Sequence, residues 1–353
     1  MIPLALTFII DLLALLGIFI IISLSLNIEF GYAGIPNFGK LLAVAGGAFF
    51  IGAVPGRVLA YIYGLLKKYD YIDNNVEVMY ALGKILGTNP FMSMAMLVVS
   101  LILAAAVGAI LGFIASYPAI RLREDYLAIT LLAMAEILRT IGYNYKDLIG
   151  GTVGISVPDP FRWIGGELRL ALAASVIMAV AIIIFIYVEL LSRSPVGRTL
   201  RAMRDNEVVA EAYGKDIVKL RMKTLMIGSA IGAIGGALYA FLSGSVTALG
   251  YDRVVYTFWP WVMVVIGGAA NNFGVLLGAT LFVTLRKLII FYKSNLQPFL
   301  PFDVVWLEYL LLGTALLIVL IYRPEGIIPE KPTHTLGKKR LEKIKELVEA
   351  KEV

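Results

Sequence analysis

The sequence predicts an all-α protein that crosses a membrane several times. Hydrophobic residues fill 59% of the 353 positions, whereas Asp, Glu, Lys and Arg together fill only 16%. Soluble domains carry about a quarter of their residues as these four charged types. The apolar residues also come in long runs, such as "LALLGIFIIISLSL" and "LRLALAASVIMAVAIIIFIYVELL". Because a helix of about 20 apolar residues spans a hydrocarbon core about 30 Å thick, these runs predict transmembrane helices.

Hydrophobic segments are expected in nine places, some of them broken. They cover residues 3–26, 39–54, 92–117, 126–143, 171–191, 224–243, 256–270, 274–292 and 304–322. The second is short for a full crossing and contains "AVAGGAFFIGA", and the seventh is also short and runs into "GGAANNFG". Glycine-rich interruptions at membrane depth favour a broken or re-entrant helix in both.

The basic residues predict the orientation. With a charged loop at 192–223 placed in the cytoplasm, eighteen of the 31 Lys and Arg residues fall inside and nine outside. Cytoplasmic loops carry such an excess, so we expect the N-terminus outside and the C-terminus inside. The chain then divides into a transmembrane domain, residues 1–328, with an outer segment at 55–90, and an amphipathic cytoplasmic tail at 329–353.

Small residues recur every fourth position in two of the segments. One set comprises Ala104, Gly108, Gly112 and Ser116, and the other comprises Gly228, Gly232, Gly236 and Ala240. Each set lies on one face of a helix, where small side chains let two backbones approach closely. We therefore expect both stripes to mark tight helix packing.

The loop 192–223 has the cap residues of two short helices. Ser194 is a suitable N-cap with Pro195 at the first helical position. Asp205 can cap a second helix that Gly214 ends, and Asp216 can cap the next membrane span. The loop is therefore expected to carry a short amphipathic helix at the cytoplasmic surface.

Acidic residues in this loop favour a docking surface over a loop that only sets topology. Four acids are interleaved with the basic residues: Asp205, Glu207, Glu211 and Asp216. Carboxylates contribute little to orientation in the membrane, so topology alone does not require them. A soluble protein partner would account for them.

Six ordered stretches resemble the branched-chain amino acid ABC transporter permeases, of the high-affinity leucine/isoleucine/valine importer type. The charged loop and the helix after it, "SPVGRTLRAMRDNEVVAEAYGKDIVKLRMKTLMIGSAIGAIGGALYA", resemble the cytoplasmic loop of that family. The others are "LNIEFGYAGIPNFGK", "RLREDYLAITLLAMAEILR", "GGTVGIS", "VVIGGAANNFG" and "YRPEGI". The resemblance covers residues 27–328 and is specific because the stretches match in order and spacing.

The resemblance implies a permease subunit of an ATP-driven importer in the plasma membrane. Its expected partners are two ABC ATPase subunits, a second permease subunit, homologous or identical, and an extracytoplasmic solute-binding protein. No G-x-x-x-x-G-K-[ST] motif occurs, so ATP and Mg would bind the partner subunits and no cofactor would bind this chain. The loop would supply a coupling helix, with contact candidates Arg204, Asp205, Glu207, Ala210, Glu211 and Gly214.

Polar and glycine residues within the spans are candidates for the substrate pathway. At helix breaks, exposed backbone groups can hold the carboxylate and ammonium of a zwitterion, and ionisable groups in spans are functional suspects. The candidates are Gly31, Tyr32, Gly34, Asn37, Lys40, Glu136, Gly267, Gly268, Asn271 and Asn272. The alternatives are close glycine packing at both breaks and a structural ion pair between Glu136 and Arg139. Asp11 has no partner nearby in the sequence.

Departures from the family pattern leave other functions open. The family more commonly has Ser and His where this chain has Asn37 and Lys40, and Gly where it has Glu124. Amides, urea or another small solute therefore remain alternative substrates, and an ion-coupled secondary transporter remains an alternative mechanism. A membrane-embedded hydrolase is disfavoured, because H-E-x-x-H is absent and the single His, His334, lies in the polar tail.

Overall fold

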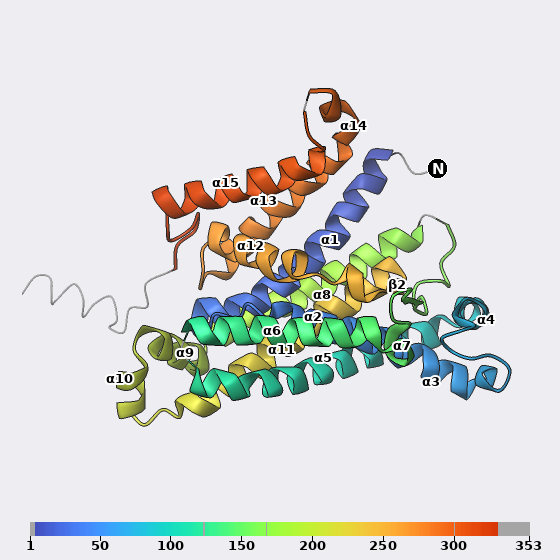
Figure 1. The fold of residues 1–353 in the computed structure, drawn as a ribbon, viewed down its shortest axis with the longest axis horizontal. Helices are drawn as coiled ribbons and strands as arrows, with labels where there is room; N and C mark the ends of the chain where they lie inside the picture. The colour runs from blue at the N-terminus through green and yellow to red at the C-terminus, as the bar shows by residue number, and fades with distance from the viewer. Residues whose placement is uncertain (1–3, 123, 167, 300, 331–353) are drawn as a thin grey trace, which may run out of the picture.

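The computed structural model describes residues 4–122, 124–166, 168–299 and 301–330, and they form a helical bundle (Figure 1). Within these residues, seven helices are long and apolar enough to cross a membrane. They are Ala5–Tyr32, Lys40–Ile62, Pro90–Arg121, Asp125–Asn144, Leu168–Arg193, Ile217–Ser243 and Asn272–Phe291. A shorter apolar helix at Val254–Gly267 and α15 (Val304–Tyr322) correspond to the other two expected segments. The prediction of an all-α polytopic membrane protein is confirmed.

The two short segments take different forms. α2 (Lys40–Ala53) meets α3 (Pro55–Ile62) at Val54, and together they form a helix of 23 residues, long enough to span. Residues 55–62 of the expected outer segment therefore belong to this helix. In contrast, α12 (Trp259–Gly267) stops at Gly268, whose φ is +116°, and a turn leads into α13 (Asn272–Phe291). That backbone angle is readily adopted only by glycine.

α11 (Ile217–Ser243) lies at the centre of the bundle, between α2, α5 (Pro90–Arg121) and α1 (Leu4–Leu26). One face carries Gly228, Gly232 and Gly236, of which the first packs against Glu29 and the other two against the start of α2. A Cβ added to Gly232 would lie 3.1 Å from Lys40 Cε. On a neighbouring face, a Cβ added to Gly112 of α5 would lie 2.5 Å from the Leu225 carbonyl oxygen. Both predicted stripes are therefore packing surfaces: one lies on α11, and the other lies on α5 and faces α11.

Most of the shorter elements lie at the two ends of the bundle (Figure 1). α9 (Pro195–Asp205) and α10 (Glu207–Ala212) lie at one end. The other end holds α3, α4 (Asn75–Thr88), α7 (Lys146–Ile149) and the β1–β2 pair (Ile155–Ser156 with Ser245–Val246). α6 (Glu124–Asn144) and α8 (Leu168–Arg193) run between the ends, and α14 (Lys293–Leu296) follows α13. Residues 331–353, most of the expected amphipathic tail, lie outside the described residues.

Candidate functional site

The charged loop folds into two short helices at the end of the bundle. The Ser194 hydroxyl accepts a hydrogen bond from the Gly197 amide at 3.3 Å, and Pro195 begins α9, as predicted. α10 is capped by Asn206, whose Oδ1 accepts from the Val209 amide at 3.1 Å. The prediction of Asp205 as this cap is wrong by one residue. Asp205 is the last residue of α9, and the extended backbone of Asn206 (φ −161°) directs its side chain to the amide instead.

Gly214 ends α10, as the sequence predicted. Its φ is +74°, and its amide donates to the Glu211 carbonyl at 2.8 Å. The Lys215 amide reaches back to the Ala210 carbonyl at 3.2 Å, which completes a Schellman motif. Asp216 then caps α11 by accepting from the Lys219 amide at 2.9 Å. Hydrogen bonds from the Lys219 ammonium and amide lower the pKa of Asp216.

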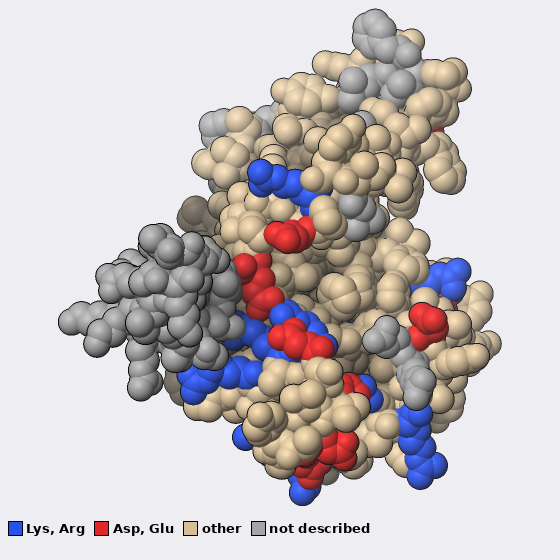
Figure 2. All heavy atoms as spheres, turned by 90° about the vertical axis from the view of Figure 1, so that its left-hand side faces the viewer, with Lys and Arg blue, Asp and Glu red and all other residues tan. Residues whose placement is uncertain are grey.

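α10 presents apolar side chains at an end of the molecule where charged residues gather (Figure 2). Val208 and Tyr213 are 77% and 80% exposed, Glu211 is also exposed, and Ala210 is buried on the inner side. Ala210 is thus a packing residue, although it is among the expected contacts. Exposed apolar groups rimmed by charge are typical of protein interaction sites.

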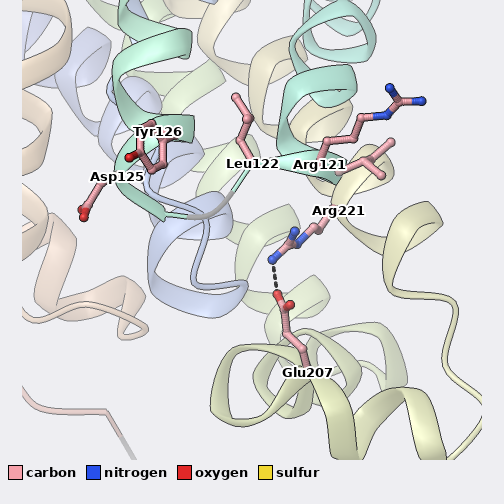
Figure 3. A pocket seen from close by; sticks show the side chains of 7 residues that line it. Arg121, Leu122, Asp125, Tyr126, Glu207 and Arg221 are labelled. Atoms are coloured by element: carbon pink, nitrogen blue, oxygen red, sulfur yellow. Dashed lines mark hydrogen bonds and ion pairs between the residues drawn. The ribbon is translucent and has the colours of Figure 1, made fainter.

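Glu207 connects α10 to the membrane helices (Figure 3). Its carboxylate forms an ion pair with Arg221 near the start of α11. A second nitrogen of Arg221 donates to the Ala119 carbonyl, in the last turn of α5, at 2.9 Å. Glu207 and Arg221 line a cavity together with Arg121 and Tyr126. Glu207 is therefore an internal link as well as an expected contact.

Arg204 points inward, toward the ends of other helices. One terminal nitrogen donates to the Gly31 carbonyl at 2.6 Å and the other to the Glu330 carboxylate at 2.8 Å. Its Nε donates to Asp205 at 3.1 Å. The side chain is only 26% exposed, and it packs against Gly34, which has a positive φ of +72°.

The first helix break, residues 27–40, encloses a buried ion pair. A π-helical turn, Asn27–Tyr32, follows α1, and α2 restarts at Lys40. The Lys40 ammonium lies 2.9 Å from Glu29 Oε1, and both side chains are fully buried. Lys40 also donates to the Gly228 carbonyl at 3.1 Å, and Asn37 donates to the other Glu29 oxygen at 2.8 Å. Each charged group therefore has an opposite charge and a further hydrogen bond, as buried charges require.

The second break, residues 267–272, lies directly against the first. Asn27 Oδ1 accepts from the Ala270 amide at 2.8 Å, and Asn27 Nδ2 donates to Asn272 at 3.0 Å. A Cβ added to Gly31 would lie 2.5 Å from the Ala270 nitrogen. Asn271 caps α13 through the Phe273 and Gly274 amides. The structure thus brings together nine of the ten predicted pathway residues, and these contacts give the glycines a packing role.

Glu136, the tenth, has other partners. Its carboxylate lies 3.1 Å from Arg139 Nε and 3.9 Å from Arg253, so the predicted pair with Arg139 forms. Asp11, for which the sequence offered no partner, forms an ion pair with Lys287 of α13.

The sequence reasoning missed Glu29 and Asn27, which organise both breaks. Each is a polar residue at the end of a long apolar run, in "LNIEFGYAG". That signal was available, since a charged residue inside a span calls for a partner. It did not identify which distant residue that partner would be.

A membrane-spanning bundle with polar helix breaks in its core and a charged two-helix loop at one end has the form of a transport permease. The chain belongs to the family described as branched-chain amino acid transport system / permease component, whose model matches residues 8–320. It is accordingly a multi-pass protein of the cell membrane and a transport subunit.

Several curated relatives are similar over most of their length. The chain is 43% identical over 321 residues to a "Probable branched-chain amino acid transport permease protein LivM" of Methanocaldococcus jannaschii, which covers 90% of this chain and 92% of the relative. It is 27% identical to the Escherichia coli "High-affinity branched-chain amino acid transport system permease protein LivM", covering 91% and 70%. It is 26% identical to a probable LivH permease protein of M. jannaschii, covering 68% and 76%. No solved structure matches the chain significantly.

Proposed function

We propose that this chain is the membrane-spanning subunit of an ATP-driven importer for branched-chain amino acids. Separate ATPase subunits dock on residues 205–214, and their closure shifts the bundle between outward and inward openings. The observation that carries the proposal is α10, which exposes Val208, Glu211 and Tyr213 at the charged end of the molecule. The complex would also contain a second permease subunit and an extracytoplasmic solute-binding protein.

The contacts of α9 and α10 supply a physical route for the mechanical step. Glu207 and Arg221 connect α10 to α5 and α11, so a displacement of α10 acts on the central helix and on a helix packed against it. Arg204 connects α9 to the Gly31 carbonyl at the first break. Packed helices transmit such shifts because their interfaces resist continuous deformation.

The substrate proposal rests on the relatives, whose names specify branched-chain amino acid transport. The solute pathway would run beside the two helix breaks, where polar backbone and amide groups lie inside the bundle. The pathway candidates named from the sequence remain part of this proposal. Uptake of radiolabelled leucine by the reconstituted complex, with and without ATP, tests it. ATP-dependent uptake of labelled urea or of an amide, with no uptake of leucine, would assign a different solute.

Charge reversal at Glu211 tests the docking surface. Glu211 is exposed, and the described part of the chain gives it no ion pair, so Glu211→Arg should leave the bundle intact while removing ATPase subunits from the purified complex. The matched control is Glu77→Arg, the same change at an exposed acid of α4 at the opposite end of the molecule. Mass spectrometry of co-purifying subunits is the measurement. Equal retention in both variants would contradict the docking assignment, and a wild-type chain that purifies alone and transports without ATP would indicate a secondary carrier.

A further inference from the structure

Residues 323–330, the segment that follows α15, fold back onto the second helix break. The Ile327 amide donates to the Ile266 carbonyl at 2.9 Å, and the Ile328 amide donates to the Gly267 carbonyl at 3.0 Å. The Asn271 side chain donates to the Pro329 carbonyl at 2.9 Å. The segment thus satisfies the carbonyl groups that α12 leaves open where it ends. It is attached to the second break on both sides of the turn.

The carboxylate of Glu330, in the same segment, forms ion pairs with two arginines of α9. Arg201 Nε lies 2.8 Å from one Glu330 oxygen, and Arg204 Nη2 lies 2.8 Å from the other. The three side chains are only 15–26% exposed. Arg201 and Arg204 are three residues apart and so project from one face of the helix. One carboxylate therefore fixes a whole helical turn of α9 to residues 323–330.

Both arginines also contact the first break. Arg204 donates to the Gly31 carbonyl, as described above, and the Arg201 guanidinium lies 5.0 Å from the centre of the Tyr32 ring. Arg201 also donates to the Ser192 carbonyl at 3.1 Å, at the end of α8. Among the described residues, α9 contacts the first break directly, and the Glu330 carboxylate gives it a separate link to the second break.

We propose that Glu330 transmits the movement of α9 to the second helix break and is a positioning residue for transport. This inference rests on the proposed function, since it requires α9 and α10 to be driven by ATPase subunits. The Glu330 carboxylate couples the position of residues 323–330 to that of α9. The hydrogen bonds to Ile266, Gly267 and Asn271 then couple the second break to residues 323–330. Without the carboxylate, α9 would act on the second break only indirectly, through the bonds that Asn27 of the first break makes with Ala270 and Asn272.

The test compares Glu330→Gln with Glu325→Gln in the complete importer, reconstituted in proteoliposomes. Glu325 is an exposed carboxylate of the same segment with no ion pair among the described residues, so it is a matched control. Glu330→Gln should keep its ATPase subunits and hydrolyse ATP, yet solute uptake per ATP should fall about fivefold or more, the lower range of coupling between sites. Glu325→Gln should match the wild type. Normal uptake per ATP in Glu330→Gln, or loss of its ATPase subunits, would overturn the inference.

A distance measurement separates transmission from simple stabilisation. The chain has no Cys, so spin labels can be placed at Arg198→Cys on α9 and Ile327→Cys in the 323–330 segment, both exposed. With Glu330 present, the distance between the labels should stay the same when ATP binds, because the two elements move together. With Glu330→Gln it should change. A constant distance in both would overturn the inference, whereas a wild-type chain without ATPase subunits would instead refute the proposed function.

Discussion

At the scale of single residues, the Glu29–Lys40 pair shows how a membrane bundle tolerates charge in its core. Both side chains are completely buried, where an isolated charge would be very unfavourable. Asn37 and the Gly228 carbonyl provide the remaining hydrogen bonds. Gly228 permits this arrangement, because a Cβ there would overlap the Glu29 carboxylate.

Removing one partner of this pair should lower the free energy of unfolding much more than removing both partners. Lys40→Met leaves the Glu29 carboxylate buried without a counter-charge, and we expect it to lower the free energy of unfolding by about 3–5 kcal/mol. The double variant Glu29→Gln/Lys40→Met removes both charges and should recover most of the loss. Thermal unfolding in detergent, followed by size-exclusion chromatography, measures the difference. A single variant as stable as the wild type would show that the pair is not needed for stability.

At the scale of helices, α11 owes its central position to small residues on two faces. The stripe of Gly228, Gly232 and Gly236 packs against Glu29 and α2, while α5 packs on a neighbouring face with Gly108 and Gly112. A Cβ added to Gly108 would lie 2.5 Å from the Ser229 carbonyl. Such close approach of backbones is how helices associate where lipid provides no hydrophobic drive.

Gly236→Ala should therefore destabilise the bundle. The added Cβ would overlap the Val44 backbone carbonyl of α2, which cannot move aside as a flexible side chain can, so we expect a cost of about 1–3 kcal/mol. Gly313→Ala in α15 is the matched control, because nothing lies within 4 Å of its added Cβ. Alanine favours a helix over glycine by up to about 1 kcal/mol, so the control should be neutral or stabilising. The same unfolding assay compares them, and equal stabilities would refute the packing argument.

At the scale of the whole molecule, the two ends differ in character. The α9–α10 end gathers charge, and Glu330 joins it there through Arg201 and Arg204 (Figure 2). The opposite end, with α3 and α4, lies on the side where α1 begins (Figure 1). Two crossings, α1 and the α2–α3 helix, bring the chain back to this side before α4, and the excess of basic residues predicts that the α9–α10 end faces the cytoplasm.

Accessibility of single cysteines tests this orientation, since the native chain has none. Val76 and Val208 are 74% and 77% exposed at opposite ends of the molecule. A membrane-impermeant maleimide should label Val76→Cys in intact cells and Val208→Cys only after permeabilisation. The reverse pattern would contradict the predicted topology.

The chain by itself determined the class of protein, the family and the local form of the charged loop. These features depend on residues close together in the sequence, namely the length of apolar runs, the count of basic residues and caps such as Ser194 and Gly214. They can therefore be recognised before the fold is known. The cap at Asn206 was missed because it depends on one residue's backbone angle.

The tertiary structure alone decided which polar residues meet. Asn27 and Asn272 are 245 positions apart, and Arg204 and Gly31 are 173 apart. Such partners are selected by how whole helices pack, and a single sequence carries no local pattern that pairs them. For the same reason the sequence did not indicate that Arg204, a predicted coupling contact, also joins the charged loop to the first helix break and to Glu330.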